Sequence, residues 1–405
     1  MLRAEPVTRL NYDIIVSGGG MTGLAMAAQL ASLDLQVAVL ESRMPAPFVA
    51  TDDFDLRVSV ISPQTVALLQ NLEVWQRVEA MRLCPYRRLR VWEMRGFGDV
   101  TFEAEQVGCP ELGFIVENRL LQIALWKTLE ALPQVHIHCP SVCSEFQRVG
   151  DKIEVLSADG QRFSGRLLIG ADGANSAVRQ AFGVGVRGAR YRQSCLVASV
   201  TTEYPQQDIT WQRFTRDGPQ AFLPLPGRHG SVVWYHRAER VEALAALDHS
   251  TLAERMMATF PRELGAIKIL AKGSFPLHKQ HANAYVQQGL ALIGDAAHTI
   301  NPLAGQGVNL GFQDSAALAE VIAEALKTRS DWWSRAALLP YQNRRRWANG
   351  LMMHAMDGFY HGFSNDIAPL LWARNAALAA AKLPLISRPV MRYAMGLDRW
   401  PNKFF

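Results

Sequence analysis

Cysteine, long apolar runs and an excess of charge of one sign are all scarce in this chain of 405 residues. The five cysteines are scattered, and only Cys139 and Cys143 lie close together, without the spacing of a zinc site. This usage favours reduced thiols in the cytoplasm over a disulfide framework. No run of about 18 apolar residues occurs, so no membrane-spanning helix is expected. The apolar stretch after Arg3 and Arg9 is short and runs into a glycine loop, so no signal peptide is expected either. A net charge of +5 is too small and too diffuse to predict nucleic-acid binding.

What is present is the composition of an ordinary folded protein. Hydrophobic residues make up 49% of the chain and charged residues 20%, which excludes a mainly disordered protein. The length suits one large domain or a few smaller ones. The ten histidines show no spacing typical of metal ligands, so no metal site is predicted.

The first motif with a chemical meaning is a glycine turn near the N-terminus. Gly18, Gly20 and Gly23 follow a predicted strand and open a predicted helix, and Glu41 ends the next strand. Gly18 permits a tight turn, and Gly20 lets a pyrophosphate approach the helix N-terminus. Gly23 allows the helix to pack closely on the strand, and Glu41 is placed to accept hydrogen bonds from ribose hydroxyls. The context predicts a dinucleotide site; a purely structural glycine turn is the alternative.

A second glycine-rich stretch lies three quarters of the way along the chain. A buried strand delivers Gly294 and Asp295 to the sheet edge where ligands of open α/β sheets bind. Gly305 and Gly307 then open a helix predicted over 307–327, whose first backbone amides favour an anion. A capped helix with a glycine lead-in is the alternative.

The third motif contains Asp172 and Gly173, in the sequence Gly-Ala-Asp-Gly. It follows an apolar strand predicted over 162–169 and precedes a helix predicted over 174–182. Alone, it is equally well explained as a tight turn with a capping aspartate.

The remaining patterns complete an α/β fold. Alternating segments split by Pro and Gly predict an antiparallel sheet in the middle of the chain, and the part after about residue 330 is mostly helical. The strands are predicted over 12–16, 36–40, 153–157, 162–169, 195–202, 210–215, 220–225, 231–236 and 290–293, and the first helix over 21–33. We therefore predict a Rossmann-like domain interleaved with an antiparallel-sheet domain, plus a helical C-terminal region. The predicted Rossmann-like domain comprises 1–75, 105–185 and 285–330, the antiparallel-sheet domain 76–104 and 186–284, and the helical region 331–405.

Taken together, the three glycine motifs resemble those of the FAD-dependent aromatic hydroxylases, the single-component flavoprotein monooxygenases. The segments 169–176 (IGADGANS) and 294–311 (GDAAHTINPLAGQGVNLG) are similar to the ubiquinone-biosynthesis branch of that family. Finer segments, such as 215–225 (TRDGPQAFLPL) and 359–365 (FYHGFSN), point to one member of that branch, which hydroxylates a demethoxy quinol. The resemblance covers nearly the whole chain and implies the aromatic hydroxylase fold, with the antiparallel-sheet domain binding the substrate.

The resemblance also implies roles for particular residues. In the family, the position of Asp295 reaches the ribityl chain of FAD, and the position of Pro302 lies beside the isoalloxazine ring. The backbone amides of Val308 and Asn309 would face the pyrimidine edge of that ring and stabilise negative charge on the reduced flavin. Pro302, Val308 and Asn309 are the expected flavin-ring environment.

Further positions match residues that the family uses to hold its cofactors. Arg57 lies where the family places an arginine against the flavin pyrophosphate. The motif with Asp172 and Gly173 is tied in the family to both FAD and the pyridine nucleotide, and Gly294, Gly305 and Gly307 belong to its third motif. The implied cofactors are therefore FAD, with NADH or NADPH as reductant.

The implied chemistry is hydroxylation of an electron-rich aromatic ring with dioxygen in a site that excludes water. The sequence identifies no general base, and His298 is expected to be a packed histidine. One aromatic set is equally compatible with a hydrophobic core and with a border of the substrate site. It comprises Trp211, Phe214, Phe222, Trp234 and Tyr235.

The C-terminal region is basic and aromatic, with nine Lys/Arg against three Asp from residue 340 onward. A solvated face of packed helices is one explanation. Contact with a membrane surface, a lipid carrier or other ubiquinone-biosynthesis proteins is the other, and it suits a polyprenyl quinol substrate. The expected location is the cytoplasm, including the inner face of the membrane, and a homo-oligomer is also compatible.

Three other functions stay open at this point. The chain could hydroxylate another ring position in the ubiquinone pathway, or act as a flavin reductase or dehydrogenase without oxygen insertion. A flavin-bearing scaffold is a third alternative, which the intact stretch 302–309 argues against because a scaffold has no use for amides that face the ring.

Overall fold

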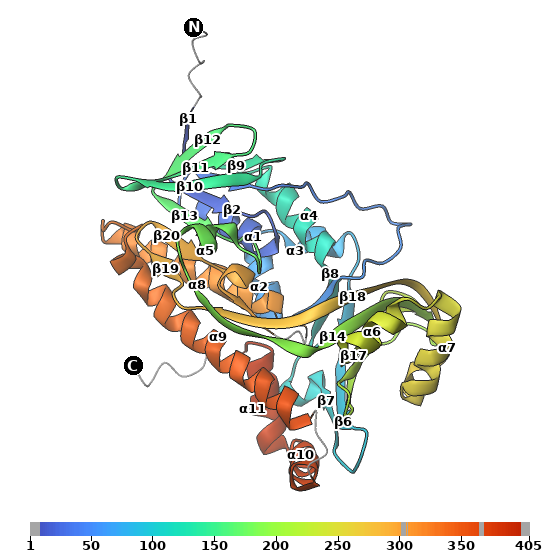
Figure 1. Ribbon diagram of the computed structural model, residues 1–405. Coiled ribbons are helices and arrows are strands. Elements are labelled where there is room, and N and C mark those ends of the chain that lie inside the picture. The colour runs from blue at the N-terminus through green and yellow to red at the C-terminus, as the bar shows by residue number, and fades with distance from the viewer. Residues whose placement is uncertain (1–8, 301–304, 306, 364–367, 398–405) are drawn as a thin grey trace.

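The computed structural model describes residues 9–300, 305, 307–363 and 368–397. At its centre is a six-stranded sheet in the order β19-β20-β13-β2-β3-β9, in which every pair except β19–β20 is parallel (Figure 1). Its strands are β2 (Ile14–Ser17), β3 (Val37–Leu40), β9 (Val135–His138), β13 (Leu167–Gly170), β19 (Val286–Gln287) and β20 (Leu290–Leu292). Four of them, β2, β3, β13 and β20, are buried along their whole length, as expected for aliphatic strands covered by helices.

Helices cover this sheet and set the start of the site. Helix α1 (Met21–Ala31) packs against both α4 (Asn118–Leu129) and α8 (Gly307–Lys327). The short helix α5 (Ala177–Ala181) follows β13. Because α1, α5 and α8 each begin after a loop at the carboxyl end of a sheet strand, their N-termini lie at one edge of the sheet.

Two small sheets flank the central one. The first has the order β1-β12-β11-β10 and the second the order β4-β8-β5. Their strands are β1 (Arg9–Asn11), β10 (Cys143–Val149), β11 (Lys152–Ser157), β12 (Arg162–Gly165), β4 (Val58–Ile61), β5 (Cys84–Tyr86) and β8 (Gly113–Glu117), and the helices α2 (Pro63–Asn71) and α3 (Trp75–Glu79) lie between β4 and β5 in the sequence.

An eight-stranded sheet in the order β21-β18-β14-β17-β16-β15-β6-β7 forms the second layer of the molecule. It is antiparallel except for the parallel pair β15–β6. Its strands are β6 (Arg88–Glu93), β7 (Asp99–Glu103), β14 (Val186–Thr202), β15 (Ile209–Phe214), β16 (Gln220–Leu225), β17 (His229–Arg237), β18 (Ile267–Ala282) and β21 (His298–Thr299). Helices α6 (Ala238–Ala245) and α7 (His249–Thr259) cover one face of it.

Three helices complete the chain. Figure 1 shows α9 (Arg335–Phe363) running along one side of the molecule towards α10 (Ala368–Ala380) and α11 (Pro384–Ala394), which lie at its lower end. None of the helices in the described residues is long and apolar enough to span a bilayer. All five cysteines are free thiols.

Much of the predicted secondary structure is confirmed, and one strand prediction is wrong. The helix predicted over 307–327 is α8, and the four alternating segments are β14 to β17. The strand predicted over 162–169 is instead two strands in different sheets, β12 and β13. The chain crosses between the sheets at Arg166, where the amides of Arg166 and Leu167 both donate to the Asp13 carbonyl.

Smaller differences have local causes. The strand predicted over 12–16 begins as β2 only at Ile14, because the Tyr12 amide donates to Ser164 in the small sheet. The helix predicted over 174–182 begins after Ser176, whose Oγ caps it by accepting from the Arg179 amide. The strands that were not predicted are β1, β4 to β10, β18, β19 and β21. The domain boundaries stay a prediction, although β21 falls outside the range predicted for the antiparallel-sheet domain.

Candidate functional site

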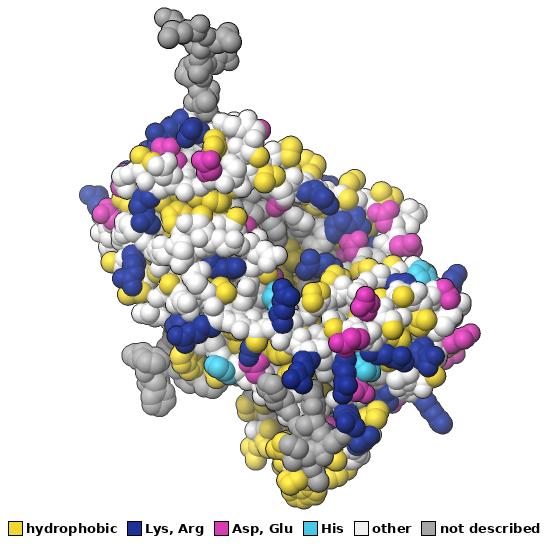
Figure 2. Space-filling view, in the orientation of Figure 1, with side chains coloured by type: hydrophobic (Ala, Val, Ile, Leu, Met, Phe, Trp, Pro, Cys, Tyr) yellow, Lys and Arg dark blue, Asp and Glu magenta, His cyan; other side chains and the backbone are white. Residues whose placement is uncertain are grey.

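The three sequence motifs come together at the carboxyl ends of adjacent strands. In the order β20-β13-β2-β3, Asp295 follows β20, Asp172 follows β13, the glycine turn follows β2, and Glu41 follows β3. Figure 2 shows that this face of the molecule is hollowed near its middle, above the region where Figure 1 places β14 and β18. Segments separated by about 280 residues of sequence thus build one site.

The glycine turn after β2 is shaped by very close backbone approaches. A Cβ on Gly18, which has φ +107°, would lie 2.5 Å from the Ala171 carbonyl oxygen. A Cβ on Gly23 would lie 2.0 Å from the Gly18 carbonyl oxygen. Both positions therefore require glycine, because any side chain would force α1 away from β2 and β13.

Gly20 differs from its neighbours because it faces open space. It is the N-cap of α1 with φ −74°, no side chain caps this helix end, and a Cβ on Gly20 would meet no atom within 4 Å. The helix end is positively polarised, and its first amides have no intrahelical partners. The space in front of Gly20 therefore fits the pyrophosphate of a dinucleotide.

Glu41 holds the glycine turn in place. Its Oε2 accepts from the Gly19 amide at 2.6 Å, and its Oε1 accepts from Ser42 Oγ and the Arg43 amide. On the other side of the turn, Gln122 Nε2 of α4 donates to the Gly19 carbonyl at 2.7 Å. A carboxylate has about four acceptor positions, so Glu41 can still accept from a ribose; that role stays a prediction.

The middle motif presents a buried oxygen that no described residue satisfies. Asp172 Oδ2 accepts from the Val178 amide at 3.0 Å, whereas Oδ1 is buried and has no hydrogen-bond partner within the described part of the chain. A Cβ on the adjacent Gly173 would meet nothing within 4 Å. Since buried carboxylate oxygens are normally paired, this position fits a donor from a bound cofactor.

Asp295 and Arg57 are brought together from distant parts of the chain. Asp295 is exposed, yet burial of its surroundings raises the pKa of its carboxyl group, while the charges of His298 and Arg57 oppose that rise. The side chain of Arg57 is also exposed. No described residue donates a hydrogen bond to the Asp295 carboxylate, which fits the predicted role of accepting from ribityl hydroxyls.

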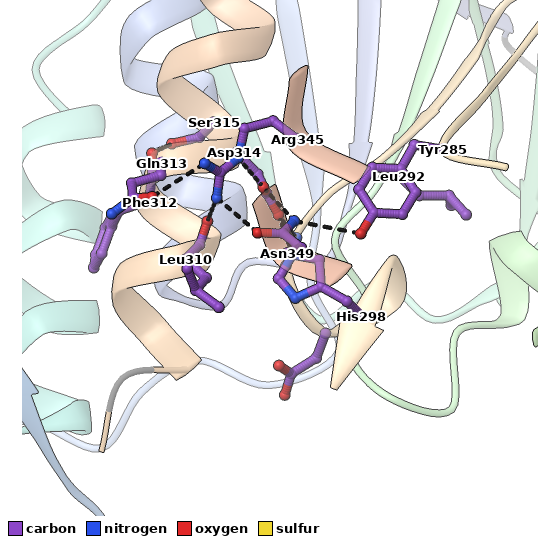
Figure 3. A network of polar contacts seen from close by, with 12 residues as sticks. Tyr285, Leu292, His298, Leu310, Phe312, Gln313, Asp314, Ser315, Arg345 and Asn349 are labelled. Carbon is purple, nitrogen blue, oxygen red and sulfur yellow. Dashed lines mark hydrogen bonds and ion pairs between the residues drawn. The ribbon is translucent and has the colours of Figure 1, made fainter. Parts of the chain in front are cut away.

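A buried network fixes the turn that carries Asp295. Asp314 of α8 is fully buried, and its Oδ2 accepts from the Gly294 amide at 3.0 Å and from His298 Nε2 at 2.5 Å (Figure 3). Its Oδ1 accepts from Arg345 Nε at 2.7 Å and Asn349 Nδ2 at 3.0 Å, both on α9. Burial alone raises the pKa of Asp314, but the charges and hydrogen bonds of His298 and Arg345 outweigh it and hold the pKa below its usual range.

Arg179 joins the middle motif to the same turn. Its guanidinium donates 2.9 Å hydrogen bonds to the carbonyls of both Ala296 and Ala174. It is 5% exposed, and burial lowers its pKa, while Asp172 opposes that effect. No role was predicted from the sequence for Arg179, Asp314, Arg345 or Asn349.

The start of α8 is tied to the strands beneath it. Asn309 Oδ1 accepts from the Ser62 amide and Thr65 Oγ1, and its Nδ2 donates to the Val60 carbonyl at 2.7 Å. Val308 is half-buried beside it, and Gly307 begins the helix. The predicted ring-facing amides thus belong to a firmly anchored helix end. Gly305 packs closely on Val60, and Pro302 lies outside the described residues.

The structure answers two questions raised by the sequence, the role of His298 and the location of the aromatic set. His298 is 2% exposed and bound to Asp314, so it is a packed histidine as predicted. The aromatic set divides between the two faces of the eight-stranded sheet. Trp211, Phe222 and Trp234 are core residues beneath α6 and α7, and Phe214 stacks on Phe363 at 4.0 Å. Tyr235 lies on the opposite face with Cys195 and Leu277.

Comparison with known proteins decides the family. A family model described as FAD binding domain matches residues 11–354. The chain belongs to this family. As a family member it is 46% identical over 392 residues to 3-demethoxyubiquinol 3-hydroxylase of Escherichia coli K12, covering 96% of this chain and 100% of that protein. It is 34% identical to ubiquinone hydroxylase UbiL of Rhodospirillum rubrum, covering 95% and 89% of the two chains.

Solved structures with low sequence identity show the same fold. p-Nitrophenol 4-monooxygenase PnpA from Pseudomonas putida DLL-E4 superimposes with a TM-score of 0.77 at 17% identity, covering 96% of this chain and 98% of that one. OxyS anhydrotetracycline hydroxylase from Streptomyces rimosus gives 0.73 at 18% identity, covering 96% and 77%. The predicted aromatic hydroxylase fold and the predicted enzyme class, a flavin-dependent monooxygenase, are confirmed.

Proposed function

We propose that this enzyme hydroxylates the aromatic ring of a prenylated quinol in ubiquinone biosynthesis, converting 3-demethoxyubiquinol to 3-demethylubiquinol with NADH or NADPH and dioxygen. The observation that carries the proposal is the 46% identity over nearly the full length of both chains to the Escherichia coli enzyme of that name. The finer sequence segments that pointed to one member of the branch agree with this similarity. NAD(P)H as reductant is part of the proposal.

The residues of this chain would hold FAD through the motifs described above. The N-terminus of α1 at Gly20 would stabilise the pyrophosphate, and Glu41 would accept from the adenosine ribose. Arg57 would neutralise phosphate charge, and Asp295 would accept from the ribityl hydroxyls. When bound, FAD supplies hydride acceptance from NAD(P)H and activation of dioxygen.

The chain's own contribution to the reaction is electrostatic and steric. The amides of Val308 and Asn309, at the positively polarised start of α8, would stabilise negative charge on the reduced ring. Anchoring of Asn309 to Val60, Ser62 and Thr65 keeps that helix end in place, so no reorganisation is needed when charge develops.

We place the quinol ring against the Tyr235 face of the large sheet. Leu56 packs in that apolar cluster and directly precedes Arg57, whose charge acts on Asp295, so the cluster begins beside the proposed flavin site. Tyr191, Met356 and Tyr360 pack against this cluster, whose own residues are buried, so the ring would lie beside it. An apolar face of this kind binds an aromatic ring and excludes water, which keeps reduced flavin from wasting oxygen.

The test is a product assay with the holoprotein, a short-tailed demethoxyquinol, each reductant and ¹⁸O₂. We expect one labelled oxygen atom in the quinol, identified by mass spectrometry, with little hydrogen peroxide. Consumption of reductant with unchanged quinol would favour a reductase or dehydrogenase. Label at another ring carbon would assign the chain to a different step of the same pathway.

A further inference from the structure

Helix α11 carries an apolar stripe that faces away from the protein. Ile386, Pro389, Val390 and Tyr393 follow the i, i+3, i+4, i+7 spacing of one helix face, and all four are exposed. The exposed fractions of Ile386, Val390 and Tyr393 are 42%, 51% and 39%. Such a stripe normally packs on a core, whereas Ile386 and Val390 are open to solvent.

The opposite side of α11 already packs on the protein. Ser387, Met391 and Met395 are 5%, 4% and 4% exposed, and the two methionines belong to the hydrophobic cluster around Cys84 and Leu225. The Gln64 amide also donates to the Met395 carbonyl. The orientation of the helix is therefore set by its inner face, and the apolar side chains of Ile386 and Val390 remain on the surface.

Neighbouring apolar side chains extend the stripe into a patch. At the start of α11, the N-cap residue Leu383 and Leu385 in the first turn are 56% and 91% exposed. On α10, Leu370 and Trp372 are 44% and 68% exposed. Figure 2 shows hydrophobic side chains gathered at the lower end of the molecule, where Figure 1 places α10. We call these residues, with the α11 stripe, the α10–α11 patch.

The segment that carries the patch has charged side chains of one sign. Residues 368–397 contain four basic and no acidic residues. One of the four, Arg374, is buried with Glu93, whereas Lys382, Arg388 and Arg392 are exposed. Two copies of this chain joined through the patch would bring like charges together. An anionic lipid surface offers the opposite charge and an apolar layer just beneath it.

We infer that the α10–α11 patch lies on the surface of an anionic bilayer, with the apolar stripe in the interfacial layer and the basic residues at the headgroups. The reason for such docking rests on the proposed function, because a prenylated quinol has almost no free concentration in water and must be taken from a lipid source such as a bilayer. The docking itself does not depend on the identity of the reaction.

The test compares sedimentation of the holoprotein with vesicles of phosphatidylglycerol and phosphatidylcholine, and of phosphatidylcholine alone. We expect binding to the anionic vesicles that falls about tenfold or more in Ile386→Glu and in Arg388→Glu. The matched controls are Met257→Glu and Arg255→Glu on α7, where Met257 is 40% exposed; these should bind like the unaltered protein. Flavin absorbance shows that each variant is folded.

The outcomes separate the alternatives. Failure of the unaltered protein to bind anionic vesicles, or equal binding by Ile386→Glu and Met257→Glu, overturns the inference. A dimer in sedimentation velocity that Ile386→Glu dissociates would assign the patch to a second copy and also overturn it. Turnover of a short-tailed quinol should survive in Ile386→Glu. Absence of such turnover in the unaltered protein, with vesicle binding intact, would refute the proposed function and leave the docking standing.

Discussion

Asp314 shows how one side chain determines the geometry of a distant site. Its two oxygens accept from Gly294, His298, Arg345 and Asn349, so a single buried carboxylate connects the β20 turn, β21, α8 and α9. Removing one partner of a buried ion pair leaves the other charge uncompensated, which is far more costly than removing both.

For Asp314→Asn we expect a loss of about 3–5 kcal/mol in the free energy of unfolding at pH 7. Because the folded-state pKa of Asp314 lies below its unfolded value, its stabilisation is present above about pH 4 and disappears as pH falls through the folded pKa. Urea unfolding, measured from pH 7 downward, should therefore show that the difference in free energy of unfolding between Asp314→Asn and the unaltered protein becomes smaller. The double variant Asp314→Leu with Arg345→Met should recover part of the loss. A difference in free energy of unfolding that grows in acid would contradict the proposed stabilising role of the Asp314 carboxylate.

Gly20 allows a second residue-scale prediction, because the protein itself has room for a larger side chain there. Gly20→Val should fold normally by circular dichroism, since no atom lies within 4 Å of the new Cβ and φ is −74°. The side chain would instead occupy the space proposed for the pyrophosphate, so the purified variant should be colourless. Stoichiometric yellow flavin in Gly20→Val would refute the site.

Asp295 is expected to lower the stability of the folded protein and to contribute to FAD binding. Its raised pKa means that ionisation is disfavoured in the folded protein, so its contribution to stability falls as pH rises through the unfolded and then the folded pKa. Asp295→Asn should therefore raise the melting temperature of the FAD-free protein at pH 7 while weakening FAD binding and turnover. Thermal scans and flavin titration measure the two effects; unchanged FAD affinity would argue against the proposed role.

At the scale of the elements, α1 lies close against the end of β2 because Gly23 has no side chain. A Cβ on Gly23 would lie 2.0 Å from a backbone oxygen that cannot move aside, whereas one on Gly358 of α9 would meet nothing within 4 Å. The same chemical change therefore has opposite consequences in two helices.

Gly23→Ala should lower the free energy of unfolding by about 1–3 kcal/mol and release flavin. Gly358→Ala, the matched control, should raise stability by about 0.5–1 kcal/mol through helix propensity alone. Chemical denaturation of both holoproteins measures the difference. Equal changes in the free energy of unfolding for the two variants would mean that α1 can move away from β2 without destabilising the protein.

Elements with a strong period were predictable, and those defined by distant partners were not. The apolar period of α8 predicted its bounds from Gly307 to Lys327. By contrast, the break at Arg166 depends on Asp13, which is remote in sequence. Strand β18 escaped prediction because its burial is mixed along its length and it becomes a strand through pairing with β14.

The same limit applies to the site. The glycine motifs could be recognised in the sequence because the functional residues of each lie within a few consecutive positions. Arg179, Arg345 and Asn349 act through contacts with carbonyls or with Asp314, more than 30 residues away for the last two, and no local pattern marks them. The only sequence signal for this network was the position of Asp314, which lies 20 residues after Gly294 on the inner side of a predicted helix.

On the scale of the whole molecule, the proposed cofactor contacts are spread over four of the six strands of the central sheet. Ligands that bind only the folded state stabilise it by RT ln(1 + [L]/Kd), about 2.7 kcal/mol at a hundredfold excess over Kd. FAD should therefore raise the melting temperature of the apoprotein in proportion to the logarithm of its concentration. The Gly20→Val variant should show no such rise, and an equal rise there would mean that FAD binds elsewhere.

The order of strands in the central sheet has a consequence for synthesis on the ribosome. Strand β2 pairs with β13, which in turn pairs with β20, so the sheet is complete only when residue 292 has emerged. At roughly 5–20 residues per second, the glycine turn waits between about a quarter of a minute and a minute for Asp295, with an unpaired sheet edge in the meantime. We therefore expect the nascent chain to need chaperones, and FAD to be captured only after translation is nearly finished.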